Sequence, residues 1–245
     1  GVQNSIYQQR YNDSVQNFVE FLRRIYSGVA NVQSLGNGRS EQAIYGKLVT
    51  FGENTDLAGQ KINETGQRDA IFVYDVIGGI GDIDSGNTLT ALTELNASVT
   101  EEKDDGVSPI GVIESYTPRW TAQIEPTNSY DPMRGMLLVV RHPRSGTIYT
   151  YYTSELVEVN ERIKEMNDSL SSGLDIGNIN VFIDGEHSGL DTWGFSAEQI
   201  DFCVNPIGDE QTLDRRDVRI KANARNASAI EIMPSDSTDN ACRRE

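Results

Sequence analysis

Apolar residues near the start of the chain recur at spacings of three and four. From Ser5 to about Val32 they form one continuous stripe, with polar and charged residues between them. This 3.6-residue period predicts an amphipathic helix with one solvent-exposed face and one buried face. We expect residues 1–35 to hold this helix and the sequence Gly36-Asn37-Gly38 to end it. The stripe comprises Tyr11, Val15, Phe18, Val19, Leu22, Ile25, Tyr26 and Val29.

After this helix the hydrophobic period changes to two. Residues 43–51 and 70–77 are rich in β-branched and aromatic residues and lie between clusters of Gly, Asn and Asp, which is typical of strands. Residues 136–141 and 147–153 flank a turn with Pro143 and Gly146, and this is the clearest hairpin. Further strands are expected at 110–116, 120–125, 179–183, 200–204, 218–224 and 229–233, the last two joined by a short turn at 225–228.

We interpret residues 1–245 as a single α+β domain, in which the long N-terminal helix packs on an antiparallel sheet. A first β region covers residues 36–153 and contains a polar, glycine-rich insertion at 78–105, with a short helix around Leu89 to Leu95. A helical period returns at 154–173 and predicts an inserted helix. Residues 174–245 form a C-terminal β region with extra strands.

Acidic residues outnumber basic ones by 37 to 21, which gives a formal net charge of −16. A field of this sign repels phosphate backbones and anionic lipid head groups, so we expect no nucleic-acid partner. A local basic run is interrupted by acidic residues, and we interpret it as a solvated strand face. This run comprises Arg215, Arg216, Arg219 and Lys221, with Asp214 and Asp217 among them.

Two cysteines occur, Cys203 and Cys242, and they lack the close spacing of zinc or redox motifs. If the protein is exported, the favoured interpretation is one disulfide that closes a C-terminal loop. The chain-entropy model values such a bond at about 4 kcal/mol for a loop of about 40 residues. The alternative is two unrelated reduced thiols.

An acidic loop offers oxygen donors for a cation. Asp82, Asp84 and Asn87 alternate through a turn much as the ligands of calcium loops do. A partner carboxylate twelve positions on is missing, so an acidic surface loop without a ligand is the favoured alternative to a calcium site.

Common catalytic signatures are absent, among them Gly-x-Ser-x-Gly, His-Glu-x-x-His and the Walker loop. We therefore expect no enzyme. A calcium-assisted hydrolase that uses Asp184, Glu186 or His187 ranks third among the functional hypotheses.

The order of these parts resembles type IV pilins and the pseudopilins of type II secretion, most of all minor pilins. The residues that carry the resemblance are the helix YNDSVQNFVEFLRRIYSGVANVQ, its passage into EQAIYGKLVTF, the strand-rich body and the late pair of Cys203 and Cys242. The large size, with the additions at 78–105 and 154–173, fits a minor subunit better than a major one.

The resemblance implies a subunit that acts in filament assembly and adhesion on the cell surface, anchored in the membrane before assembly. Its partners would be other pilin subunits and a host-cell or surface ligand. It also implies an apolar helix half upstream of Gly1, which would supply the membrane contact. The assembly face would be Val15, Phe18, Val19, Leu22, Ile25, Tyr26 and Val29.

A free-standing extracellular domain that binds a sugar or a protein is the main alternative. Loops near Trp120, Tyr130 and Trp193 would then be the first places to look for a ligand, although aromatic residues more often belong to a core. The sequence before Gly1 discriminates between the two hypotheses, because a cleavable signal peptide there favours the alternative.

Overall fold

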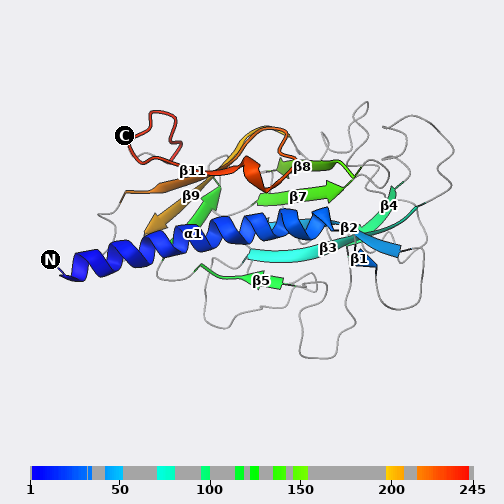
Figure 1. The fold of residues 1–245 in the computed structure, drawn as a ribbon, viewed down its shortest axis with the longest axis horizontal. Helices are drawn as coiled ribbons and strands as arrows, with labels where there is room; N and C mark the ends of the chain where they lie inside the picture. Colours follow the sequence, from blue (N-terminus) through cyan, green and yellow to red (C-terminus); the bar gives the residue numbers. More distant parts are fainter. Residues whose placement is uncertain are drawn as a thin grey trace.

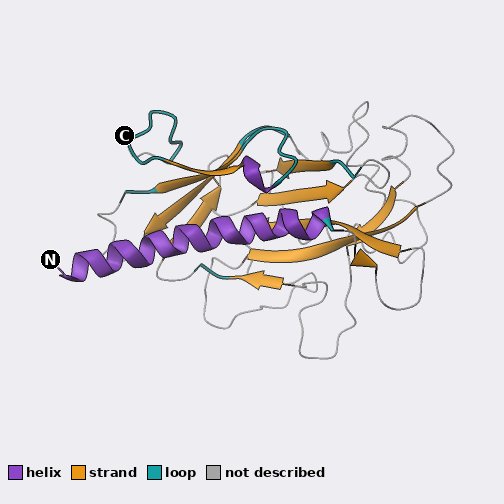
Figure 2. Cartoon of the chain, viewed as in Figure 1, coloured by secondary structure: helices purple, strands orange, loops and turns teal. Residues whose placement is uncertain are grey.

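A computed structural model describes residues 2–31, 33–34, 42–51, 71–80, 95–99, 114–118, 122–126, 135–141, 146–153, 197–206 and 214–242. Within these residues lie one long helix and two antiparallel sheets, so the chain is α+β as predicted (Figures 1 and 2). Two sheets replace the single sheet that the sequence suggested. The helix lies across both of them, and its N-terminal turns extend beyond the strands (Figure 1).

The helix α1 runs over Val2–Ala30 and has 29 residues. Every residue of the predicted stripe from Tyr11 to Val29 is buried, at 3% exposure or less. Phe21, which the stripe omitted, is buried too and stacks on Tyr116 with ring centroids 4.5 Å apart. The covered face of the helix is therefore wider than the sequence pattern indicated.

The larger sheet has seven strands, with β4, β3, β2, β7 and β8 side by side in that order. The short strand β1 adds to β2, and β5 adds to β3; all neighbours are antiparallel. The bounds are β1 Gln33–Ser34, β2 Gln42–Phe51, β3 Ile71–Ile80, β4 Leu95–Val99, β5 Glu114–Tyr116, β7 Gly135–Arg141 and β8 Ile148–Thr153. The predicted hairpin of β7 and β8 is confirmed.

Side chains of the larger sheet alternate between two buried faces. Val49, Val73 and Leu137 belong to the core under the helix, as the period of two requires. Leu48 and Leu138, one position away, point to the other face and are also buried. The central strands therefore read as apolar runs, because both of their faces are covered.

The smaller sheet has the strand order β11, β10, β9, β6 and is antiparallel throughout. Its strands are β6 Ala122–Pro126, β9 Ile200–Pro206, β10 Arg216–Ile220 and β11 Ile230–Met233. Phe202 of β9 lies at the centre of the shared core. Its ring is 5.6 Å from that of Phe18 on the helix and 4.9 Å from that of Phe51 on the larger sheet. One core thus joins the helix to both sheets.

The helix ends earlier than the sequence predicted, at Ala30 rather than near Val32. Asn31 donates from its side chain to the carbonyl of Ser27 at 3.3 Å, and Arg141 donates to the carbonyl of Ala30. These bonds satisfy backbone acceptors that a helix end leaves free. Gln33–Ser34 then pairs with β2, so strand pairing replaces helix inside the expected 1–35 range.

The predicted strand at 218–224 is too long, because β10 ends at Ile220. Asn223 adopts a left-handed backbone with φ of 54°, which a strand cannot hold. The N–H of Lys221 bonds to the carbonyl of Ala229 at 3.1 Å and closes the loop. The expected short turn is therefore a longer loop that ends in the 3₁₀ helix η3 Ala227–Ala229.

The strand β4 was not predicted. Leu95, which the sequence assigned to the end of a short helix, is paired with Ile80 of β3. Strand β3 continues through Gly78 and Gly79, where the insertion was expected to begin, and this extension provides the backbone partners for β4. The local hydrophobic pattern cannot predict a strand that forms by pairing with a distant segment.

Two other predicted elements, the helix at 154–173 and the strand at 179–183, lie outside the described residues. Within the residues that the structure describes, no helix has the length and apolar character needed to cross a bilayer.

The packing of Phe18 generates a stability prediction. Replacing Phe18 with Ala should lower the free energy of unfolding by about 3–5 kcal/mol, since it removes a buried ring and leaves a cavity between the helix and the sheets. Asn17→Ala, at an exposed neighbouring position, should change it by no more than about 0.5 kcal/mol. Urea denaturation measures both. Equal midpoints for the two variants would contradict the placement of the helix.

Candidate functional site

Tyr11 fastens the helix to the smaller sheet. Its hydroxyl donates to the carbonyl of Val204 at 2.6 Å and accepts the backbone N–H of Arg216 at 2.9 Å. Val204 and Arg216 are register partners, so the hydroxyl bridges one pair at the end of β9 and β10. Burial raises the pKa of Tyr11 to about 12, even though the N–H of Arg216 opposes the shift. The hydroxyl therefore keeps its proton at physiological pH.

Tyr26 makes the second polar attachment, near the C-terminal end of the helix. Its hydroxyl lies 2.8 Å from the Thr150 hydroxyl on β8, and Thr150 donates its proton to the carbonyl of Ala224 at 2.8 Å. Because Thr150 has only one proton to give, Tyr26 is the donor between them. This chain of bonds connects the helix, the larger sheet and the loop after β10. Burial raises the pKa of Tyr26 to about 12 and keeps the donor in place.

The first turns of the helix differ from the rest in exposure. All side chains from Ser5 to Arg10 are exposed. Ile6 at 42% and Tyr7 at 37% are the large apolar side chains exposed among the described residues. The stripe that the resemblance assigns to assembly is buried inside the chain, so it offers little surface to a neighbour. Contact with another subunit along this helix would therefore fall on Ile6 and Tyr7.

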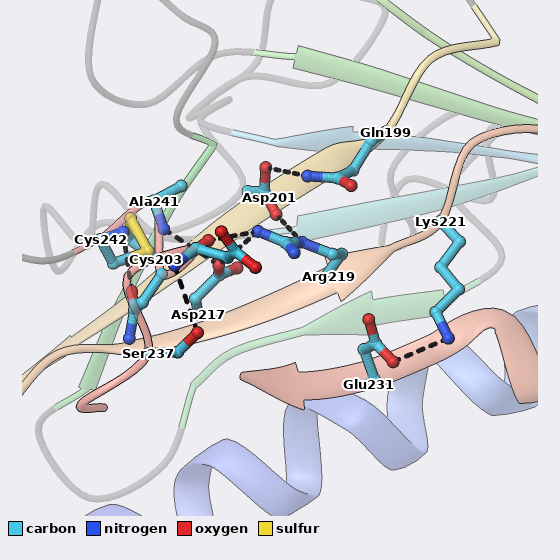
Figure 3. A network of polar contacts seen from close by, with 12 residues as sticks. Gln199, Asp201, Cys203, Asp217, Arg219, Lys221, Glu231, Ser237, Ala241 and Cys242 are labelled. Atoms are coloured by element: carbon cyan, nitrogen blue, oxygen red, sulfur yellow. Dashed lines mark hydrogen bonds and ion pairs between the residues drawn. A yellow bond between two sulfur atoms is a disulfide. The ribbon is translucent and has the colours of Figure 1, made fainter. Parts of the chain in front are cut away.

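The outer face of the smaller sheet holds a buried charge cluster (Figure 3). Arg219 bonds through Nε to Asp201 at 2.5 Å and through a terminal nitrogen to Asp217 at 3.3 Å. The same nitrogen donates to the carbonyl of Asp239 at 2.6 Å. The side chains of Arg219 and Asp201 are 10% exposed, and that of Asp217 is 0% exposed. The sequence interpretation of this run as a solvated strand face is wrong at Asp217 and Arg219.

The carboxyl group of Asp217 is perturbed by this environment. Burial, followed by the negative charge of Asp201, raises the pKa of Asp217 from 3.8 to about 6, against the opposing effects of the Ala241 N–H and Arg219. Two carboxylates close together cannot both ionise freely in a desolvated place. The cluster therefore changes its charge in a mildly acidic range.

The C-terminal residues cover this cluster. The predicted disulfide between Cys203 of β9 and Cys242 is confirmed, with a sequence separation of 39. The N–H of Ala241 bonds to Asp217 Oδ2 at 3.2 Å, and Asn240 donates to the carbonyl of Pro234 at 3.2 Å. The tail thus returns to the sheet through one covalent bond and a few hydrogen bonds.

A small open pocket lies between strand β8 and the loop after β10. Its volume is about 60 Å³, and its walls include Tyr149, Tyr151, Asn223 and Arg225. Aromatic surface beside an amide and a guanidinium is a common combination in ligand sites.

Most residues that the sequence marked for chemistry lie outside the described residues. These are the calcium candidates Asp82, Asp84 and Asn87, the hydrolase candidates Asp184, Glu186 and His187, and the aromatic residues Trp120, Tyr130 and Trp193. Across the described part of the chain, no group of three or more His, Cys, Asp or Glu residues is arranged to hold a metal ion. Calcium binding stays a prediction.

No family model, curated protein or solved structure matches this chain. The functional argument therefore rests on the described geometry and on the sequence pattern.

The hydrophobic pattern missed the Asp201, Asp217 and Arg219 cluster because it ranks charged residues as exposed. A weak signal was present. Asp217 and Arg219 occupy alternate positions of one strand and so share a face, and Asp201 occurs in the strand predicted before it. The strand register that places Asp201 opposite Arg219 cannot be read from the local sequence.

The two bonds of Tyr11 generate a matched pair of tyrosine variants. Tyr11→Phe should lower the free energy of unfolding by about 1–3 kcal/mol, because a buried carbonyl and a buried N–H lose their partner. Tyr7→Phe removes the same atom from an exposed side chain and should change stability by less than about 0.5 kcal/mol. Thermal and urea denaturation measure the difference. A Tyr11→Phe variant as stable as the wild type would show that this hydroxyl does not fasten the helix.

Proposed function

We propose that this chain is a subunit of a type IV pilus-like surface filament, a minor pilin or pseudopilin that acts in filament assembly and surface contact. The observation that carries the proposal is the division of the helix into two parts. Residues from Tyr11 onward are buried against the chain's own sheets, whereas the earlier turns extend with exposed side chains. A helix held firmly at one end and exposed at the other suits insertion between neighbouring subunits.

The exposure of the first turns supports the same proposal. Most helical stability in proteins comes from packing an apolar face, and the side chains from Ser5 to Arg10 are exposed. Ile6 and Tyr7 would gain that packing from a neighbouring subunit. The buried stripe would then contribute to assembly indirectly, because it fixes the helix on the sheets and so sets the direction in which the first turns extend.

The disulfide-closed C-terminal region is a second supporting feature. The resemblance to pilins rests in part on a late cysteine pair, and Cys203 and Cys242 form a bond. Such a bond suits an oxidising compartment. Localisation on an extracellular filament, with other pilin subunits as partners, is part of the proposal.

A ligand-binding extracellular domain is the second candidate function. The pocket beside β8 favours it, because Tyr149 and Tyr151 offer apolar surface next to the polar Asn223 and Arg225. In a filament subunit the same pocket would be the place for a surface ligand, so the two functions differ in assembly rather than in this site.

Assembly is tested by introducing charged residues at these positions and expressing the variants in the organism that produces the protein. Ile6→Glu and Tyr7→Glu should each reduce the subunit in sheared surface filaments by about tenfold or more, because about 1.4 kcal/mol of lost contact energy is a factor of ten. Gln16→Glu adds the same charge at an exposed position over the body of the domain and should assemble normally. Immunoblots of filament, membrane and medium fractions give the amounts.

The folding of each variant is checked separately by the melting temperature of the purified protein, which should stay at the wild-type value because all three positions are exposed. Normal assembly of both helix variants would overturn the assignment of the contact to Ile6 and Tyr7. Wild-type protein found as a monomer in the medium, with none in the filament fraction, would overturn the filament itself and favour the second candidate.

A further inference from the structure

The tail over residues 234–242 lies against an array of polar groups. On β10, Val218 and Ile220 belong to the core, so the alternate residues Asp217 and Arg219 point to the opposite face. The tail reaches that face at three places. Asp239 accepts from Arg219 through its carbonyl, Ala241 donates to Asp217, and Cys242 is bonded to Cys203.

The charged side chains of the sheet under the tail include one arginine and two aspartates. Asp201 and Asp217 bring two negative charges, and Arg219 brings one positive charge. From β11, Glu231 lies opposite Arg219 and is paired with Lys221 at 2.8 Å, so that pair adds no net charge. The neighbour of Asp217 on β11 is Met233, which is uncharged. From the tail, Asp239 contributes its carbonyl, and its side chain is exposed.

The two oxygens of Asp217 have different surroundings. Oδ2 accepts from both Arg219 and Ala241. Oδ1 is buried and has no hydrogen-bond partner. A proton on Oδ1 would supply the missing bond by donating to the carboxylate of Asp201, and it would leave both bonds to Oδ2 intact. An ionised Oδ1 instead remains unsatisfied beside a like charge, which is costly in a desolvated place.

We propose that residues 234–242 form a proton-controlled latch, which is seated when Asp217 carries a proton on Oδ1 and loosened when Asp217 is ionised. The disulfide limits how far the loosened tail moves. Opening the tail admits water to the two carboxylates and relieves their repulsion. The latch involves residues of β9, β10 and the tail and does not depend on assembly into a filament.

The direction of the pH dependence follows from the raised pKa of Asp217, about 6 against an ordinary 3.8. The seated state binds the proton more tightly than the open state. Its stabilisation is therefore complete below pH of about 4 and is lost as the pH rises through about 6. The latch is seated at pH 5 and loosened at pH 8.

Hydrogen exchange at the amide of Ala241 tests the latch in the disulfide-intact protein. After correction for intrinsic exchange rates, its protection should fall by about ten- to a hundredfold between pH 5 and pH 8, because one to two pK units of linkage correspond to that factor. Asp217→Asn replaces the proton with a permanent amide donor to Asp201 and keeps an oxygen for Ala241. Its protection should be high and independent of pH.

Glu231→Gln is the matched control, since it removes a carboxylate from the same sheet without touching Asp217. It should keep the wild-type pH dependence. A wild-type tail equally protected at both pH values would overturn the proposal, and so would an Asp217→Asn variant that retains the wild-type fall.

A measurement on the wild-type protein keeps the test decisive if Asp217→Asn does not fold. The carboxyl carbon resonance of Asp217 should titrate near pH 6 together with the amide resonance of Ala241. Titration of Asp217 near its ordinary pKa, with no matching change at Ala241, would overturn the latch.

Discussion

Burial of the helix stripe between Tyr11 and Val29 is the interaction on which the rest of the fold depends. The stripe, the inner face of the larger sheet and the inner face of the smaller sheet form one core. Phe202 contacts Phe18 on one side and Phe51 on the other, so neither sheet could keep its place if the helix left. The tyrosine hydroxyls at both ends of the stripe add direction to this apolar contact, because a hydrogen bond fixes geometry that hydrophobic burial leaves free.

The parts of the fold that the sequence predicted are those encoded by local period. A stripe over about five helical turns and a hairpin around Pro143 and Gly146 can each be recognised from a short stretch of sequence, and the structure contains both. Assignments failed where a distant partner decides the outcome. Leu95 belongs to a strand because β3 continues through Gly78 and Gly79 and pairs with it. Gln33–Ser34 is a strand rather than part of the helix because it pairs with β2. The split into two sheets likewise depends on pairings that no local pattern contains.

The candidate site was predictable only in its covalent part. Two cysteines in a chain allow one intramolecular disulfide, whereas the charges beneath the tail have many potential partners. Burial of Asp217 and Arg219 runs against the tendency of charged residues to stay in water. It is tolerated because Arg219 bonds to both Asp201 and Asp217, and the Ala241 N–H adds a bond to Asp217 Oδ2. Buried ion pairs contribute little net stability, but breaking one leaves an uncompensated charge. In this protein the ion pairs of Arg219 add little to stability, but their arrangement responds to the protonation of Asp217.

Strand β9 brings the two ends of the chain's described part together. Val204 receives the Tyr11 hydroxyl on the helix side, and the adjacent Cys203 holds Cys242 on the outer side. Successive residues of a strand point to opposite faces, so one short segment fastens the helix on one face and the tail on the other. The extending helix turns and the tail accordingly lie at the same end of the molecule (Figure 1). A partner that binds Ile6 and Tyr7 would approach this end, where the charge of the cluster depends on pH. If both proposals hold, protonation beneath the tail and contact at the helix would be coupled through β9.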